Sequence, residues 1–264
     1  MKLLTLNAHS KPESCERELK ILSEAICDEQ PDVIALQEVC QTRLAPNAVI
    51  NPLMGGGEVK EDNFALRLSD ILENKGKKYN AVWKAAKIGY DKYDEGLALF
   101  LKKPVKKIHC FCVSRENNYN SWKTRIALGA ETEEEIFFSL HFGRWGDEED
   151  SFSAQWERFN SQLENIAKGK KLWLMGDFNA PDDICGESYD AVLKKGFSDS
   201  FAAARVKTGG ATVKGKIDGW QSGESKRIDF IFSSFGAEVK SAEVVFSGEN
   251  REIISDHFGV LAEI

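Results

Sequence analysis

Carboxylate and amide side chains of the kind that bind metal ions follow an apolar run in the second half of the chain. In the stretch LMGDFNAP, Asp177 and Asn179 come just after the apolar residues 172–175. Side chains alternate along a strand, so residues two apart point the same way, and we expect these two groups side by side at a strand end. Taken alone, the stretch favours an ordinary turn, because Gly, Asp, Asn and Pro are all turn residues.

The same arrangement recurs along the sequence, with a chemically useful polar residue at the edge of an apolar run. The further examples are Asn7, Glu38, Glu95, His141, Asp229, Asp256 and His257. Each alone has a structural explanation as a turn, a cap or a solvated group, although Asp229 lies inside an apolar run, where a carboxylate needs a partner. If these strand ends meet at one mouth of a folded sheet, they form a site for a hard cation with acid–base groups beside it.

The elements that must position these residues are mostly strands. Apolar runs predict strands at 2–7, 33–37, 81–88, 97–101, 108–113, 126–131, 136–141, 172–175, 228–232, 243–246 and 258–264. Several of these runs are almost continuously apolar, which indicates strands that are covered on both faces. Apolar residues at spacings of three and four predict amphipathic helices at 13–29, 62–75 and 152–168, and a shorter helix at 189–195.

Many strands and few helices favour an α/β fold in which two sheets pack on each other and helices cover their outer faces. We expect a single domain over residues 1–264, because no repeat or low-complexity linker divides the chain. The segment 40–61 contains three consecutive glycines and predicts a long loop. Loops of that length in compact domains are usually functional or mobile.

Composition narrows the possible functions. The net charge is −7 and there is no long basic run, which disfavours a protein that holds nucleic acid through its phosphates. No apolar run approaches the roughly 20 residues that span a bilayer, and the N-terminus lacks the features of a secretory signal. We therefore expect a cytoplasmic protein with no membrane partner. The six cysteines have no metal-binding or disulfide spacing, and we expect them to be reduced. Cys110 and Cys112 should share a strand face and be mostly core residues or neutral thiols.

Seven motifs together resemble the endonuclease/exonuclease/phosphatase superfamily, which includes deoxyribonuclease I. They are TLNAHS, DVIALQEV, YDEGLALF, SLHFG, LMGDFNAP, RIDFIF and SDHFGV, they occur in the family's order, and they span nearly the whole chain. The resemblance implies a four-layer α/β/β/α sandwich of two mainly antiparallel sheets flanked by helices, like that of deoxyribonuclease I. It also implies a divalent-metal site and hydrolysis of phosphoesters.

Carried over position by position, the resemblance assigns a metal site and a water site. Glu38 resembles the principal Mg²⁺ ligand, helped by Asn7 and Asp256, with Mn²⁺ as a possible substitute. Asp177 resembles the residue that orients or deprotonates the attacking water. Asn179 would hold that water or a phosphate oxygen.

The resemblance also assigns groups that act on the phosphoryl oxygens. His257 would donate to the phosphoryl group, with Asp229 fixing its ring, and His141 would contact the phosphate or protonate the leaving oxygen, supported by Glu95. These roles agree with what phosphoester hydrolysis requires: in-line attack by water, neutralisation of oxygen charge and help for the leaving group. Arg125 matches more loosely a strand arginine that some members aim at the phosphate, and a structural ion pair fits it nearly as well.

The loops between the motifs favour a small sugar phosphate as substrate. They mix aromatic and polar side chains, which suit a sugar ring that carries one phosphate; the candidates are Tyr93, Trp122, Lys123, Trp145 and Trp220, with Arg144, Lys214 and Arg227 as further phosphate or hydroxyl contacts. The strings EDNFAL, IGYDKYDEG, NSWKTR and GKIDGW resemble a bacterial branch of the superfamily that includes maltose 6′-phosphate phosphatases. The resemblance thus implies a metal-dependent phosphomonoesterase of carbohydrate metabolism.

Two other functions stay open at this point. A nuclease of the same fold would use a basic groove, which the acidic composition makes less favourable. A catalytically silent binding module would keep the fold without the chemistry, but the polar residues match every catalytic motif of the superfamily. Polar sets of this kind cost stability, which argues against their presence without a use.

Overall fold

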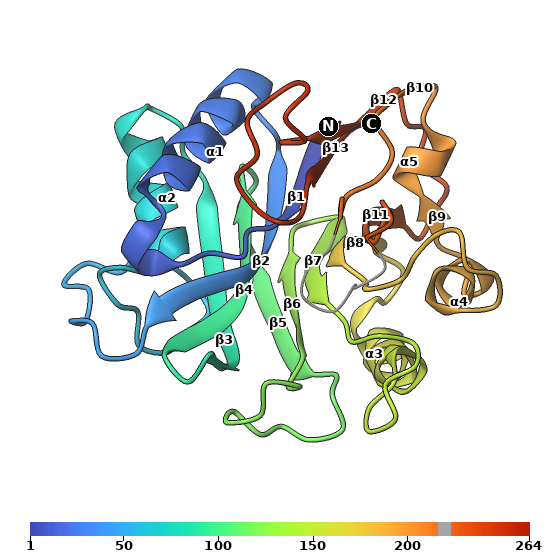
Figure 1. Cartoon of the computed structure of the whole chain (residues 1–264), viewed down its shortest axis with the longest axis horizontal. Coiled ribbons are helices and arrows are strands. Elements are labelled where there is room, and N and C mark those ends of the chain that lie inside the picture. The colour runs from blue at the N-terminus through green and yellow to red at the C-terminus, as the bar shows by residue number, and fades with distance from the viewer. Residues whose placement is uncertain (216–222) are drawn as a thin grey trace.

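Two β-sheets form the centre of the protein in a computed structural model, which describes residues 1–215 and 223–264 (Figure 1). The seven-stranded sheet contains, in spatial order, β10 (Val206–Thr208), β12 (Ser241–Val245), β13 (Gly259–Glu263), β1 (Lys2–Asn7), β2 (Val33–Thr42), β4 (Tyr93–Leu101) and β3 (Asn80–Gly89). The six-stranded sheet contains β5 (Lys107–Cys112), β6 (Ile126–Glu131), β7 (Glu135–His141), β8 (Lys171–Asp177), β11 (Asp229–Ser233) and β9 (Ser198–Asp199).

Most neighbouring strands are antiparallel. The parallel pairs are β1 with β2, β10 with β12, and β7 with β8. The parallel pairs matter for the site because parallel strands present their C-terminal ends at the same edge. Asn7 therefore lies near residues 37 and 38, and His141 lies opposite Asp177 in the register of β7 and β8.

Helices cover the outer face of each sheet (Figure 1). The first sheet carries α1 (Glu16–Glu29) and α2 (Phe64–Asn74), and the second carries α3 (Phe152–Ile166) and α4 (Ser188–Lys194). Two short elements complete the described part: a 3₁₀ turn, η1 (Pro12–Ser14), and α5 (Ser200–Ala203). This is the predicted four-layer α/β/β/α sandwich of mainly antiparallel sheets.

Three apolar cores hold the layers together. Leu3 lies in the core between the sheets, whereas its neighbour Leu4 lies in the core under α1 and α2. The third core packs the aromatic residues of α3, such as Phe159, against the outer face of the second sheet. Because successive residues of a strand enter different cores, the strands read as continuous apolar runs.

Several details differ from the sequence-based expectations. The helix predicted at 13–29 begins at Glu16, after η1, and the short elements β9, β10 and α5 carried no clear apolar pattern. β2 extends to Thr42, into the predicted loop. Of the two alternatives for Cys110, a core residue or a neutral thiol, the first is wrong: Cys110 is exposed on the edge strand β5, and Cys112 is half-buried.

The two ends of the chain lie together (Figure 1). β1 pairs with β13, and the Met1 amino group donates to the carbonyl of Ile264 over 3.0 Å. In residues 1–215 and 223–264, no helix has both the length and the apolar character needed to cross a bilayer.

Candidate active site

A β-bulge aims Glu38 at the mouth between the two sheets. The pairing of β2 with β4 shifts register between Leu36 and Val39, and Glu38 has a φ of 50°, which is unusual for a residue other than glycine. A bulge bends its strand and redirects a side chain, and strained backbone of this kind clusters at functional sites. Nothing in the sequence of β2 marks this bulge.

Asn7 joins the carboxylates of the two sheets. Its Nδ2 donates to Oε1 of Glu38 over 2.9 Å and to Oδ2 of Asp177 over 3.2 Å. Asn7 and Asp177 end strands of different sheets and are both buried. The Ser255 hydroxyl donates to the Asn7 carbonyl over 2.7 Å, which ties the segment before β13 to the same place.

His9 is a site residue that the sequence analysis missed. Its Nδ1 lies 3.1 Å from Oε2 of Glu38 and 3.7 Å from Oδ1 of Asp256. The hydrogen bond to Glu38 raises the pKa of His9, although burial opposes this shift. Burial disfavours the charged form of Glu38, but the hydrogen bond from His9 holds the pKa of Glu38 well below 4.5. The available signal was spacing, because His9 follows Asn7 by two residues, as Asn179 follows Asp177.

The second imidazole of the site, His257, forms a buried pair with Asp229. Its Nδ1 lies 2.9 Å from Oδ2 and 3.2 Å from Oδ1 of Asp229, which is fully buried and aligned with Asp177 in the register of β11 and β8. Burial by itself lowers the pKa of His257, but the charges of Asp229 and Asp177 raise it to about 10. His257 is therefore an imidazolium at neutral pH, with Nε2 3.8 Å from Oδ2 of Asp177.

The third imidazole, His141, is in the opposite state. Burial, reinforced by the charge of Arg125, lowers the pKa of His141 well below 6.5, so that it is neutral at pH 7. Its Nε2 lies 3.5 Å from Oδ2 of Asp177 and its Nδ1 lies 4.0 Å from Oε1 of Glu38. Burial also raises the pKa of Asp177 to about 7, which is a suitable range for a group that accepts a proton from water.

Asn179 is held in a turn as well as in the site. Its backbone N–H donates to Oδ1 of Asp177 over 2.8 Å, its Nδ2 donates to the Phe142 carbonyl over 2.9 Å, and its φ is 47°. The turn and the functional interpretation of LMGDFNAP are thus compatible, because the turn is what places Asn179 beside Asp177.

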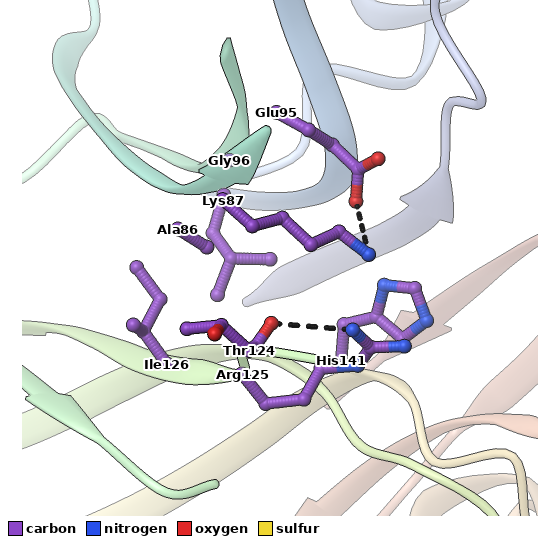
Figure 2. A pocket seen from close by; sticks show the side chains of 9 residues that line it. Ala86, Lys87, Glu95, Gly96, Thr124, Arg125, Ile126 and His141 are labelled. Carbon is purple, nitrogen blue, oxygen red and sulfur yellow. Dashed lines mark hydrogen bonds and ion pairs between the residues drawn. The ribbon is translucent and has the colours of Figure 1, made fainter. Parts of the chain in front are cut away.

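Glu95 and Arg125 lie on the walls of a small pocket next to the carboxylates (Figure 2). Glu95 forms an ion pair of 3.0 Å with Lys87, a residue that the sequence analysis did not select, and His141 lines the same pocket. Arg125 Nη1 donates to the carbonyls of Trp122 and Thr124 over 2.9 and 3.2 Å. Strand alternation does not predict that Lys87 faces this pocket, because a second bulge, in β3 between Ala85 and Lys87, sets the direction of its side chain.

The predicted substrate contacts are spread more widely. Tyr93 is buried, and its hydroxyl donates to Glu13 over 2.5 Å, so its polar end is already paired. Trp122 is 64% exposed beside the pocket. Lys123 pairs with Asp147 and Glu149 and lies over the Trp122 ring, Trp145 packs on Phe152, and Trp220 lies outside the described residues.

Arg227 and Lys214, two further cations named from the sequence, differ in their surroundings. Arg227 pairs with Asp182 and with buried Asp199 and lies over the ring of Phe230. These contacts make Arg227 a structural residue. Lys214 is exposed.

The donor set fits a hard divalent cation. Carboxylate oxygens from Glu38, Asp177 and Asp256 surround one mouth, and such oxygens are the ligands that Mg²⁺ and Mn²⁺ take. The Asn7 amide lies between them, with Nδ2 facing the carboxylates and Oδ1 accepting from the His9 N–H over 3.2 Å. A second grouping overlaps this one: ligand atoms of Asp177, Asp229 and His257 lie within 4.8 Å of one another. The Nδ1 of His257 is engaged with Asp229, so we favour the oxygen-rich set around Glu38.

The chain belongs to the Endonuclease/Exonuclease/phosphatase family, which matches residues 4–257. Members of this family are hydrolases that act on phosphoester bonds and generally depend on divalent metals, and this chain is a hydrolase of that family. The resemblance drawn from the seven motifs is thereby confirmed. No curated protein matches the chain significantly.

Solved structures resemble this one over their full length. An endonuclease/exonuclease/phosphatase family protein from Leptotrichia buccalis is 29% identical, with 100% of this chain and 99% of that chain covered and a TM-score of 0.85. A mannosyl-6-phosphatase from Bacteroides thetaiotaomicron is 19% identical (100% and 98% covered, TM-score 0.70). The 3′ phosphatase NExo from Neisseria, bound to a product DNA hairpin, is 20% identical (100% and 99% covered, TM-score 0.65). The last two similarities concern the fold alone.

Proposed function

We propose that this chain is a Mg²⁺-dependent phosphomonoesterase that acts on a small sugar phosphate such as maltose 6′-phosphate, with Mn²⁺ as a possible substitute metal. The observation that carries the proposal is the meeting of Glu38, Asn7, Asp177 and His257 at one mouth between the sheets. Part of the proposal is that residues 1–264 form one domain and that the protein works in the cytoplasm.

A divalent cation bound beside Glu38 would neutralise charge on the phosphoryl oxygens. The residues of the chain then have separate tasks. Asp177, whose pKa is raised to about 7 by burial, orients the attacking water and accepts its proton, and Asn179 holds that water or a phosphoryl oxygen. His257 donates from Nε2 to a phosphoryl oxygen as an imidazolium, because Asp229 occupies Nδ1 and fixes the ring.

The leaving oxygen needs a proton or a hydrogen bond. His141 is suited to donate a hydrogen bond to it, because its low pKa keeps it neutral while one ring nitrogen still carries hydrogen. Glu95 lines the same pocket and pairs with Lys87, whose charge lowers the pKa of His141. Arg125, which directly precedes β6 of the second sheet, lines this pocket and would contact the phosphate.

Three observations support a sugar phosphate over a nucleic acid. The net charge of −7 disfavours a polyanion. Trp122 is 64% exposed next to the pocket, with Lys123 over its ring, and an aromatic face beside polar groups suits a sugar. The Bacteroides structure with the same fold is named as a sugar phosphatase. Tyr93, Trp145 and Trp220 stay candidates for the same surface.

The decisive experiment is a substrate panel with Mg²⁺: maltose 6′-phosphate, other hexose and disaccharide phosphates, nucleotides and DNA, with release of inorganic phosphate as the signal. We expect the highest kcat/KM for a sugar phosphate and no activity in EDTA. Asp177→Asn should be inactive with the metal present. An enzyme that releases phosphate from none of the sugar phosphates would refute the proposed substrate class.

A nuclease or DNA phosphatase is the second candidate, and the structure of NExo with a DNA hairpin is the observation in its favour. Such an enzyme would bind DNA through phosphate contacts, so its activity would fall steeply as salt rises. Cleavage or dephosphorylation of DNA at low enzyme concentration, weakened strongly between 50 and 200 mM salt, would favour this alternative.

A further inference from the structure

Two cations from different sheets share the pocket beside the carboxylate cluster. Lys87 comes from β3, Arg125 precedes β6, and Figure 2 shows both side chains reaching the pocket wall that His141 also forms. Lys87 is only 7% exposed, which is rare for a lysine. Exposed lysines contribute to the solubility of a protein, but a buried lysine does not, so the position of Lys87 needs another explanation.

A bulge in β3 directs Lys87 to this pocket. The pairing of β3 with β4 shifts register between Ala85 and Lys87, so that Lys87 lies opposite Glu95. Without the extra residue, strict alternation would send the Lys87 side chain to the other face of the sheet. The bulge in β2 that aims Glu38 lies across the same strand β4, and the two bulges therefore place an anion and a cation at one mouth.

The two cations retain hydrogen-bonding capacity. The ammonium of Lys87 contacts Oε1 of Glu95 at 3.0 Å and the Trp122 carbonyl at 2.9 Å, so the contacts with described residues engage two of its three donors. The Trp122 carbonyl also accepts from Arg125 Nη1. Arg125 Nε is buried without a hydrogen-bond partner among the described residues, which is costly unless a ligand supplies an acceptor.

The charge balance of the pocket favours an anion. Among the residues that line the pocket, Lys87 and Arg125 face one carboxylate, that of Glu95. Burial and the repulsion from the Arg125 charge lower the pKa of Lys87. A phosphoryl group placed against this wall would relieve that repulsion. A monoester near neutral pH carries close to two negative charges and three free oxygens, whereas a diester carries one charge and two free oxygens.

We propose that Lys87, with Arg125 beside it, binds the free oxygens of a phosphate monoester and makes the site selective for dianionic monoesters over monoanionic diesters. This inference rests on the proposed function, because it concerns the same reaction. It adds a selectivity residue, Lys87, that neither the motifs nor the fold indicates.

The test compares two substrates that share a leaving group, p-nitrophenyl phosphate and bis(p-nitrophenyl) phosphate, with Mg²⁺. Lys87→Met removes the charge, and Lys87→Met/Glu95→Gln removes it without leaving Glu95 buried and unpaired. Lys84→Met is the matched control, because Lys84 lies on the same strand and donates to the Gly55 carbonyl. Calorimetric titration of each protein with inorganic phosphate and with dimethyl phosphate provides a measurement that needs no turnover.

We expect the ratio of monoester to diester kcat/KM to fall about 30-fold in both Lys87 variants, as for loss of a charge-assisted hydrogen bond. In the Lys87 variants, the Kd of inorganic phosphate should rise by a similar factor and the Kd of dimethyl phosphate should stay unchanged. In Lys84→Met, both Kd values should equal those of the wild type. If Lys87 has only a structural role, its replacement would lower kcat/KM equally for the monoester and the diester. That result, or an unchanged Kd of inorganic phosphate, overturns the proposal. A wild-type protein that hydrolyses only the diester would instead refute the proposed function, and the phosphate titration would still decide the role of Lys87.

Discussion

The substitution Asp229→Asn separates the charge of Asp229 from its role in orienting His257. Asparagine keeps an oxygen that accepts from Nδ1–H of His257, so the ring orientation is retained, but the negative charge is lost. Raising the pKa of His257 from 6.5 to about 10 corresponds to about 5 kcal/mol in favour of the imidazolium. Asp177 and Asp256 still contribute part of this, so we assign about 3 kcal/mol to Asp229.

In the variant, the loss of about 3 kcal/mol lowers the pKa of His257 by about 2 units, so the imidazolium persists at pH 7 but is largely lost at pH 9. If His257 stabilises the phosphoryl oxygens as a cation, kcat at pH 9 should fall about 10-fold, because the protonated fraction of His257 falls by about that factor, while kcat at pH 7 changes much less. The basic limb of the wild-type kcat profile, expected toward pH 10, should move to lower pH. The assay is phosphate release at saturating substrate and Mg²⁺ across the pH range in which the protein stays folded.

Stability gives a second measurement with a definite sign. Because the folded-state pKa of His257 is raised, its pair with Asp229 contributes fully below pH 6.5, and the contribution is lost as pH rises toward 10. The difference in unfolding free energy between wild type and Asp229→Asn should therefore shrink as pH rises from 7 to 10. Wild-type kcat at pH 9 in the variant, or an unmoved pH profile, would refute this reasoning.

Glu135→Gln is the matched control for that experiment. Glu135 is also a buried carboxylate, bonded to Trp173 Nε1 over 3.0 Å and to Lys103 over 3.0 Å. It begins β7, about 20 Å from His141 at the other end of the strand. The control should lower stability and leave kcat unchanged.

Four further outcomes follow from the structure. Asp177→Asn should lower kcat about 1,000-fold, as expected for loss of the group that takes the proton from water, measured as phosphate release. Removal of divalent cations with EDTA should abolish activity, and added Mg²⁺ should restore it. Arg227→Met should lower the free energy of unfolding in urea by about 3 kcal/mol, because Asp199 stays buried without its cation. Gly176→Ala should prevent folding, because φ is 144° and the added Cβ would lie 2.0 Å from the Leu140 carbonyl oxygen.

The last two predictions have controls in the same chain. Arg205→Met removes an exposed pair with Glu238 and should change the unfolding free energy by less than about 1 kcal/mol. Gly146→Ala adds a Cβ with nothing within 4 Å and should leave folding intact. Equal losses in Arg227→Met and Arg205→Met, or a folded Gly176→Ala protein, would contradict the structural reasoning.

The sequence predicted the layers well because both faces of the central strands are buried. Leu3 and Leu4 belong to different cores, so their strand reads as continuously apolar and indicates a covered sheet. The start of α1 was placed too early because η1 carries Glu13 and Ser14, which resemble the first turn of the helix. Cys110 was misplaced because position in a sheet decides exposure, and the sequence does not say which strand lies at the edge.

For the site, strand ends were predictable and bulges were not. Asn7, His141 and Asp177 end their strands; parallel pairing brings His141 beside Asp177 and Asn7 beside Gln37, and the packing of the two sheets brings the pairs together. Glu38 and Lys87 are aimed by register shifts that have no sequence signature.

Contacts between residues that are distant in the sequence could not be predicted either. His9 was passed over because its neighbour Asp256 is 247 positions away in the chain. Tyr93 was selected for substrate without any sign that Glu13 accepts from its hydroxyl. The catalytic and binding roles assigned to individual residues stay predictions until the variants are measured.

The pairing of β1 with β13 has a consequence for biosynthesis. Asn7 leaves the ribosome about 250 residues before Asp256 and His257, which complete its surroundings. Contacts between such distant segments form late, since closing a long loop costs entropy before the contacts repay it. A nascent polypeptide halted before residue 256 would lack the contacts of His257 with Asp229 and Asp177, so the polar cluster between the sheets is complete only after translation has passed that point.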